Sequence, residues 1–322
     1  MEGSSASLPR AGGGADAPLA GAALVALSAY FVIVWGAGFV ASRVALQYAA
    51  PFTYIGVRYA IAFFVALFAF GLRARWPRER AAWGHVVVAG LLSHAGYLGG
   101  SHYAQRWGLS AGVTALVLAL QPLLTAVIVS RWLHERLSAL QKIGVAVGLA
   151  GVALVVGQRA ETGGVSLASL GAIAWSLACV TAGTLYQRQF CAGIDLRAAV
   201  CVHFAATALV MLPLGVAIEG FAIEWNRSIA LALVYHVLLA SIGAYSIFHV
   251  LMRHGQATGV TSLLYLTPPV AALCEWLVFG LLPTPVMWVG MVVACIGVAM
   301  VARPPARAAA GTSRSDPAPG TP

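Results

Sequence analysis

The sequence has few charged residues. Only 9 % of its 322 residues are Asp, Glu, Lys or Arg, whereas an ordinary soluble domain is about 25 % charged. This scarcity excludes a cytosolic enzyme, a secreted disulfide scaffold and a disordered regulator. The five cysteines are an odd number without CxxC or Cys/His spacing, so they are interpreted as small apolar residues. No metal or other cofactor is predicted.

Apolar residues make up 60 % of the chain. A membrane-spanning helix needs about 20 of them, and ten apolar segments can be marked: 20–43, 51–71, 82–104, 110–131, 138–157, 165–187, 197–218, 228–252, 257–281 and 285–302. The connections between them are too short for a soluble domain. The sequence therefore predicts an all-α integral membrane protein with ten transmembrane helices.

The basic residues are distributed unevenly along this topology. The two tails and the loops after segments 2, 4, 6 and 8 hold 14 Lys and Arg, against four in the alternate loops. By the positive-inside rule both termini are cytoplasmic, so the positive charge indicates orientation and not binding to nucleic acid. Residues 1–19 and 303–322 are rich in Gly, Ser, Ala and Pro and are predicted to be disordered cytoplasmic tails. Abundant Ala, Gly and Arg indicate a GC-rich bacterial genome, and hence the inner membrane.

The chain repeats itself at a shift of 146 residues. The matches pair Pro122, Gly144 and Gly151 with Pro268, Gly290 and Gly297. Two repeats, residues 20–157 and 165–302, would each hold five helices, and five is odd, so the repeats must lie in opposite orientations. Such inverted repeats are typical of secondary transporters, with a substrate site near the midplane between the halves.

Several stretches carry a family resemblance. WGAGFVASRVAL (35–46), Pro51 followed by Arg58, and the run 110–155 resemble the EamA repeat of the drug/metabolite transporter superfamily, and residues 257–301 carry the repeat again. The resemblance covers residues 25–302 and implies a transporter that works by alternating access. Members resemble exporters and importers of many solutes, and for this chain we expect export of an amino acid, amine or drug-like metabolite. The second half departs from the pattern, with Leu281-Leu282 where the first has Glu135-Arg136.

Glu275 is the only acidic residue inside a predicted span. A carboxylate at the centre of a membrane costs roughly 2.5–3.5 kcal/mol on insertion scales, so its presence needs an explanation. We predict that Glu275 couples transport to protons. The alternatives are a side chain that leans toward the headgroups and one that is paired with an Arg.

Arg58 is the only basic residue well inside a span, about 10 Å below Pro51 along a helix. Two interpretations are open, and Arg58 is kept among the candidate substrate-binding residues: it binds an anionic group of the substrate, or it is a structural tie to backbone carbonyls or to Glu275. The second is favoured because similar proteins carry Arg here whatever they transport.

Two polar stripes follow helical spacing. His94, Tyr97 and Ser101 share one face of segment 3, and Ser241, Tyr245 and His249 share a face of segment 8. Polar stripes on apolar helices should face a water-filled cavity or a partner helix. We predict that they line the substrate path; the alternative is interhelical hydrogen bonding worth about 0.6 kcal/mol per bond.

Further residues complete the predicted site. Trp35, Gln121 and Tyr265 are predicted to line the substrate path, and Pro122 and Pro268 to act as helix hinges, since proline removes a helical hydrogen bond. Phosphates would need several basic groups, and only Arg58 qualifies, so a nucleotide sugar is disfavoured. The expected partners are a small-molecule substrate and the lipid bilayer, with no nucleic acid.

Two questions stay open in the sequence. The competing function is an intramembrane enzyme or sensor that would use His94, His102, His203, His236 and His249, although no HExxH motif is present. Matched small residues in segments 5 and 10 predict close helix contact. That contact could join these two helices or two copies of the chain, so either a monomer or a homodimer is expected.

Overall fold

The computed structural model describes residues 21–132, 137–161, 163–244, 247 and 264–302. Within them the regular structure is helical, apart from one isolated antiparallel bridge between Ala49 and Ile223. Eight of the described helices are long and apolar enough to cross a membrane: Val25–Ala45, Pro51–Ala69, Ala111–Trp132, Ala139–Glu161, Leu167–Phe190, Leu196–Glu219, Arg227–Ala244 and Pro285–Ala302. The chain is therefore a multi-pass membrane protein.

The helices of the first half follow the predicted segments closely. They are α1 (Gly21–Ala45), α2 (Pro51–Ala69), a 3-10 turn η1 (Gly71–Arg73), α3 (Arg80–Gly90), a π-helical turn η2 (Leu91–Gly96), α4 (Tyr97–Arg106), α5 (Ala111–Leu118), α6 (Gln121–Trp132) and α7 (Ala139–Glu161). The second half holds α8 (Leu167–Phe190), α9 (Leu196–Glu219), α10 (Arg227–Val234), the π-helical η3 (Tyr235–Ala244), the 3-10 turn η4 (Leu264–Leu266), α13 (Thr267–Phe279) and α14 (Pro285–Ala302).

Two of the ten predicted spans, the third and the ninth, are not among these eight helices. The third is helical from Arg80 to Arg106, but its second half, YLGGSHYAQR, is polar. The ninth is described only from Leu264 onward, and α13 has 13 residues, too few to cross a bilayer alone. The number ten thus stays a prediction. The two predicted tails, Tyr245 and His249 lie outside the described residues.

The paired prolines begin helices instead of bending them. After α5 ends at Leu118, α6 starts at Gln121, one residue before Pro122; likewise α13 starts at Thr267, one residue before Pro268. Proline is tolerated in the first turn because the amide hydrogens there have no partner within the helix. The two starts keep the shift of 146 residues, so corresponding helices of the two repeats begin at matched prolines. Whether these starts act as hinges stays a prediction.

The third helical run of each repeat contains a π-helical turn, η2 in the first and η3 in the second. A π turn inserts an extra residue into the helix and is frequent at functional sites. His94 lies in η2, and His236 and Ser241 lie in η3. The turns therefore change which side chains face inward, in a way that a period of 3.6 residues does not predict.

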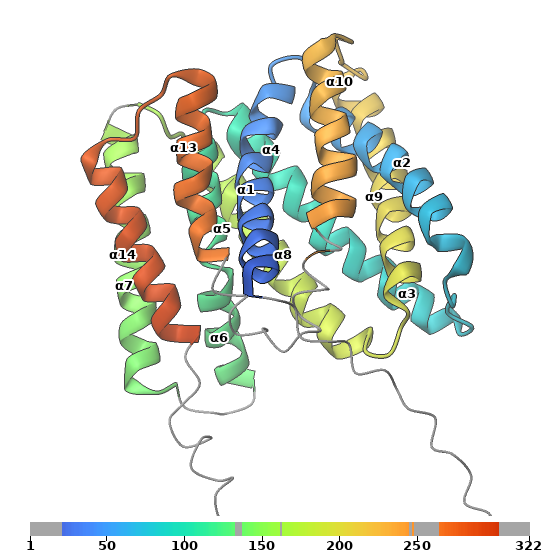
Figure 1. Ribbon diagram of the computed structural model, residues 1–322, viewed down its shortest axis with the longest axis horizontal. Coiled ribbons are helices and arrows are strands. Elements are labelled where there is room, and N and C mark those ends of the chain that lie inside the picture. The colour runs from blue at the N-terminus through green and yellow to red at the C-terminus, as the bar shows by residue number, and fades with distance from the viewer. Residues whose placement is uncertain (1–20, 133–136, 162, 245–246, 248–263, 303–322) are drawn as a thin grey trace, which may run out of the picture.

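Helices of the two repeats pack on one another. α2 packs on α9, α5 on α13 and α7 on α14, while α1 packs on α10 and η3, and α8 on η2 and α4. Each of these contacts between a helix of the first repeat and a helix of the second thus has a counterpart in which the two repeats are exchanged. This is expected when two repeats are related by a twofold axis. In Figure 1 the pairs α7/α14 and α2/α9 form opposite edges, with α1 between them.

The matched glycines make the α7/α14 contact. A Cβ on Gly297 would overlap the backbone of Gly148, and one on Gly151 would overlap the backbone of Ala294. The backbones therefore approach closely, as small residues allow. The predicted packing is confirmed, and of the two open possibilities the structure shows contact within one chain.

Both described chain ends lie at one end of the bundle. α1 begins and α14 ends at the lower end in Figure 1, while α1 meets α2, and α9 meets α10, at the upper end. At the lower end Asp195 caps α9 and accepts the Arg75 N–H at 2.9 Å. These backbone N–H groups, from Arg75 and then Arg197, lower the pKa of the Asp195 carboxyl. The charge pattern predicts that the upper end faces outward.

Candidate functional site

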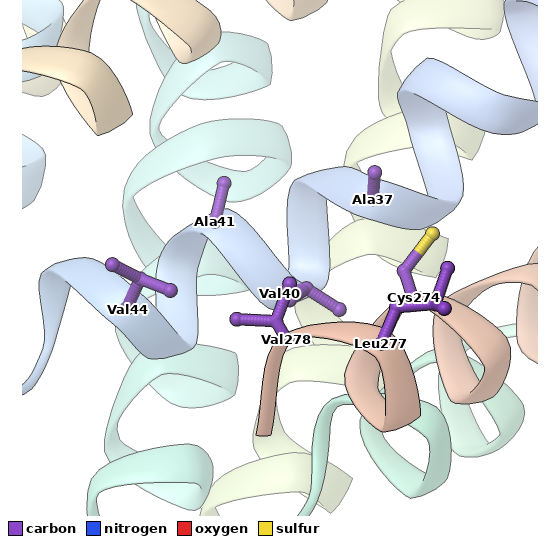
Figure 2. A pocket seen from close by; sticks show the side chains of 7 residues that line it. All are labelled: Ala37, Val40, Ala41, Val44, Cys274, Leu277 and Val278. Atoms are coloured by element: carbon purple, nitrogen blue, oxygen red, sulfur yellow. The ribbon is translucent and has the colours of Figure 1, made fainter. Parts of the chain in front are cut away.

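A surface groove between α1 and α13 is apolar. It has a volume of about 250 Å³ and is lined by Ala37, Val40, Ala41, Val44, Cys274, Leu277 and Val278 (Figure 2). Leu277 and Val278 are exposed. The groove offers no polar side chain to orient a solute, so the candidate site has to be sought among the buried polar residues.

Arg58 is the buried cation of the bundle. It lies on α2, is 7 % exposed, and sits seven residues past the helix start at Pro51. Its Nη2 donates to Ser241 Oγ at 3.4 Å, and its guanidinium lies 5.1 Å from the centre of the Tyr59 ring. Its charge acts on Tyr97 and His102 of α4. Arg58 is thus placed among residues of both repeats.

One polar network joins α2, α1 and η3. The Tyr54 hydroxyl lies 2.7 Å from Nδ1 of His236, and Nε2 of the same ring lies 3.3 Å from Ser42 Oγ. Tyr54 is one turn from Arg58 on the same helix, and Arg58 interacts electrostatically with His236. All three network residues are buried. The first repeat therefore supplies the hydroxyls and the second the imidazole.

A second network lies on the other side of α2. The Tyr59 hydroxyl is 2.9 Å from Nδ1 of His94, and the His94 ring lies 5.5 Å from that of His203 on α9. His203 Nε2 is buried without a hydrogen-bond partner among the described residues. Two helices of the first repeat and one of the second thus meet at a pair of imidazoles.

His102 completes the group. Its ring stacks on Tyr54 at 6.1 Å, its Nδ1 lies 3.4 Å from Ser101 Oγ, and within the described chain its buried Nε2 has no partner. We call the following residues the central polar cluster: Tyr54, Arg58, Tyr59, His94, His102, His203, His236 and Ser241. The cluster offers hydroxyls, imidazoles and one fixed positive charge in an apolar bundle, which suits the binding of a small polar solute.

The predicted site residues divide between the cluster and other places. Arg58 and His94 lie in it, and Tyr97 and Ser101 border it on α4. Trp35 packs on Phe31 in an apolar group near η3, and Gln121 donates to Thr184 Oγ1 at 2.8 Å. Tyr265 is buried in the apolar core beside α14. The structure therefore does not gather these last three around Arg58.

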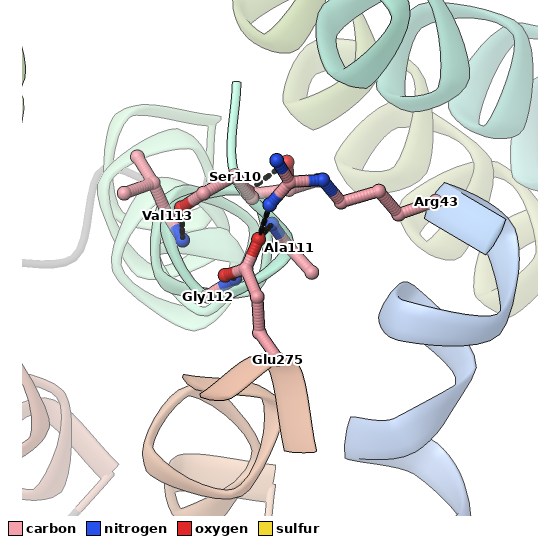
Figure 3. A network of polar contacts seen from close by, with 7 residues as sticks. Arg43, Ser110, Ala111, Gly112, Val113 and Glu275 are labelled. Carbon is pink, nitrogen blue, oxygen red and sulfur yellow. Dashed lines mark hydrogen bonds and ion pairs between the residues drawn. The ribbon is translucent and has the colours of Figure 1, made fainter. Parts of the chain in front are cut away.

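Glu275 is buried and bound at the upper end. It forms an ion pair with Arg43 of α1 and accepts the backbone N–H groups of Ala111 at 2.9 Å and Gly112 at 3.1 Å (Figure 3). The carboxylate thus closes the start of α5, where a helix favours negative charge. The expected arginine partner of Glu275 is confirmed and is Arg43. The alternative in which Glu275 leans toward the headgroups is wrong, because its side chain is buried. The alternative in which Glu275 is tied to Arg58 is also wrong. Proton coupling stays a prediction.

Glu219 makes a similar contact that its place at the end of an apolar segment does not predict. From the end of α9 it accepts the N–H groups of Phe52 and Thr53 at 2.9 and 2.8 Å, and the Tyr103 hydroxyl at 2.7 Å. It therefore closes the start of α2 as Glu275 closes the start of α5. In both cases the acid lies on a helix of the second repeat and binds the start of the first-repeat helix that packs against it: α9 packs on α2, and α13 packs on α5.

The similarities to known proteins agree with this architecture. The model of the EamA-like transporter family matches twice, at residues 20–157 and 162–303, which together span most of the chain. The chain belongs to the EamA-like transporter family. A solved crystal structure has a similar fold, with a TM-score of 0.61 and 20 % identity over 87 % of this chain and 96 % of that one.

Curated proteins similar to this EamA-like chain are named as transporters. The "Uncharacterized transporter YvbV" of Bacillus subtilis is 27 % identical over 76 % of this chain and 80 % of that protein. The "Probable amino-acid metabolite efflux pump" of Salmonella typhimurium is 25 % identical over 84 % and 92 %. The "Probable terminal-alkyne amino-acid exporter" of Streptantibioticus cattleyicolor is 26 % identical over 84 % and 91 %.

Several cluster residues of this EamA-like protein were not predicted to bind substrate. His102, His203 and His236 have no spacing relation with Arg58, because they come from three other helical runs. Tyr59 directly follows Arg58 in α2, a spacing that does not put two side chains on one helix face. His102 also lies beside Ser101 and off the predicted stripe. A buried aromatic or histidine near the depth of Arg58 is the only signal in the sequence, and it does not say which helices become neighbours.

Proposed function

We propose that the chain is a secondary transporter that exports a small organic solute, such as an amino acid or a related metabolite, by alternating access. The observation that carries this proposal is the central polar cluster, in which α2, η2 and α4 of the first repeat meet α9 and η3 of the second around Arg58. A cluster built from both repeats can change its accessibility when the repeats move relative to each other. The names of two relatives, an amino-acid metabolite efflux pump and a terminal-alkyne amino-acid exporter, support export of such solutes.

The contacts at the upper end of the bundle support a conformation that is closed toward the outside. Glu275 and Glu219 each join the repeats there. Opening toward the upper end by movement of the repeats would have to break these two contacts. The helix starts at Pro122 and Pro268 are the proposed places where the fourth helix of each repeat bends.

We propose a proton-coupling role for Glu275 in a specific form. All of its partners donate N–H groups to it, so its contacts depend on the negative charge of the carboxylate. Protonation would weaken the ion pair with Arg43 and the contact with α5 together. Proton binding and opening of the upper end would then be one event, which is what coupling requires.

Transport can be tested in everted membrane vesicles from cells that express the chain. The vesicles should accumulate a solute from a mixture of amino acids and related metabolites when a proton gradient is imposed, and the accumulation should fall when the gradient is collapsed. Vesicles from cells without the protein serve as the control. Equal accumulation in both vesicle types would contradict the proposal.

The proposed topology has ten helices, inverted repeats and both termini in the cytoplasm of a bacterium. Single cysteines at the positions of Arg78 and Lys142, in a background without the native cysteines, should be shielded from an impermeant thiol reagent added outside intact cells. A cysteine at the position of Asn226, which caps α10 at the upper end, should be labelled. The opposite labelling pattern would invert the whole assignment.

A further inference from the structure

We propose that the connection between α2 and α3 binds the headgroup of an anionic phospholipid such as phosphatidylglycerol. We call residues 73–80 the basic connection. It lies at the lower end of the bundle, where it contacts Asp195, and the charge pattern predicts that this end faces the cytoplasm. The inference concerns the lipid around the protein and does not depend on which solute is transported.

The basic connection has more positive charge than nearby acids can balance. Its four arginines are all exposed: Arg73, Arg75, Arg78 and Arg80. The acids beside them are Glu79 and Asp195, so two of the four positive charges are in excess. The ion pair that the described residues form joins Arg43 to Glu275 at the other end of the bundle. Within the described part of the chain, none of these four guanidiniums is therefore paired with a carboxylate.

Hydrogen bonds hold the basic connection in one shape. The Ala74 N–H closes the 3-10 turn η1 by donating to the carbonyl of Gly71 at 3.0 Å. The Arg75 N–H donates to Asp195 Oδ2 at 2.9 Å, which ties the connection to the start of α9. A site that is ordered before its ligand arrives loses little conformational freedom on binding. The arginines are thus presented from a fixed backbone.

Two exposed tryptophans accompany the arginines. Trp76 and Trp83 stack nearly parallel, with ring centres 5.7 Å apart. The Trp83 Nε1–H donates to the carbonyl of Pro77 at 2.8 Å, which fixes the pair against the connection. Tryptophan is enriched where a membrane meets water, because its ring is apolar and its N–H is polar. The pair therefore fits a connection that lies at the level of the headgroups.

An exposed apolar strip leads down to the arginines. Phe64 and Phe68 share one face of α2, and Leu72 continues the spacing of four residues into η1. Their side chains are 56 %, 70 % and 69 % exposed. Acyl chains fit such a strip, and a phosphate accepts hydrogen bonds from guanidinium groups. A soluble anion would use the arginines alone, so the combination favours a lipid.

The second repeat shows that the fold does not require these charges. The counterpart of the basic connection joins α9 to α10 at the upper end and carries Glu224, the exposed Trp225 and, at the start of α10, Arg227. The two connections share a tryptophan and differ in charge. Orientation in the membrane needs positive charge on one side. A fixed shape beside an apolar strip is expected in addition when the charges bind a lipid.

Lipid binding can be measured by native mass spectrometry of the purified full-length protein in neutral detergent. Dioleoyl phosphatidylglycerol and dioleoyl phosphatidylcholine, which have the same acyl chains, are added in equal amounts. Phosphatidylglycerol should be retained at least about fivefold more, because each basic residue near an anionic headgroup contributes about 1 kcal/mol. Equal retention of the two lipids would overturn the proposal. So would full displacement by inorganic phosphate, which would indicate a site for soluble anions.

Variants assign the lipid to the basic connection. The double variant Arg75→Gln/Arg78→Gln should lose most of the preference for phosphatidylglycerol, and each single variant should lose part of it. Arg227→Gln, which changes an exposed arginine at the upper end, is the matched control and should keep the native preference. Without added lipid the double variant should unfold at the native temperature, because both side chains are exposed. A preference that survives in the double variant, or an equal loss in Arg227→Gln, would overturn the assignment.

Discussion

Replacing Glu275 with Gln should abolish gradient-driven accumulation of the solute while leaving solute-for-solute exchange intact. Gln keeps the size of the side chain but cannot form the ion pair with Arg43 that holds α13 to α1 and α5. A proton then has no carboxylate to neutralise, so the gradient cannot drive the opening of the upper end. Exchange needs no net proton movement and should persist. Both rates can be measured in the same proteoliposome preparation.

Glu219→Gln is the matched control. Glu219 also closes a helix start, but its partners are backbone N–H groups and hydroxyls without a guanidinium. This variant should still accumulate solute with the native dependence on pH. If Glu275→Gln accumulates solute at the native rate with an unchanged pH profile, Glu275 has a structural role alone. If both variants lose accumulation equally, the loss reflects a weakened upper end and not proton coupling.

Replacing Gly297 with Ala should destabilise the protein by about 1–3 kcal/mol, the usual cost of overpacking a close contact. The added Cβ would overlap the backbone of Gly148, which cannot move aside as a flexible side chain could. α7 and α14 would have to separate along the contact that joins the fifth helices of the two repeats. The free energy of unfolding of the purified protein in mixed micelles measures this loss.

Gly171→Ala is the matched control, for which we expect no loss of stability. Nothing lies within 4 Å of a Cβ built on Gly171, which is exposed on α8. Ala is a better helix former than Gly by up to about 1 kcal/mol, so this variant should be as stable as the native protein or more so. A Gly297→Ala protein as stable as Gly171→Ala would show that the α7/α14 contact is not close.

Much of the fold could be predicted from the sequence because its signals are local. Hydropathy located the eight spans that the described residues support, and the shift of 146 residues paired Pro122 with Pro268, each of which lies in the first turn of a described helix. The glycine spacing predicted the face that α7 presents to a neighbour. The identity of that neighbour needed the structure, because a spacing within one helix does not say which helix fits it.

The candidate site was predictable only in part, for a different physical reason. Arg58 and Glu275 stood out because a charge inside an apolar segment is costly wherever it lies. The partners in these networks could not be predicted, because they are far away in the sequence. Arg43 is 232 residues from Glu275, and His236 is 182 residues from Tyr54. The π-helical turns also shift the inward face of η2 and η3 away from a regular helical period.

The central claim is that one site, shared by the two repeats, faces one side of the membrane at a time. Counterflow tests it most directly: proteoliposomes loaded with unlabelled solute are diluted into a trace of labelled solute, with no ion gradient. Because each outward movement of unlabelled solute returns the site to bind labelled solute, the label should rise transiently above its equilibrium level inside. A monotonic rise to equilibrium, or chemical alteration of the solute, would contradict transport by alternating access.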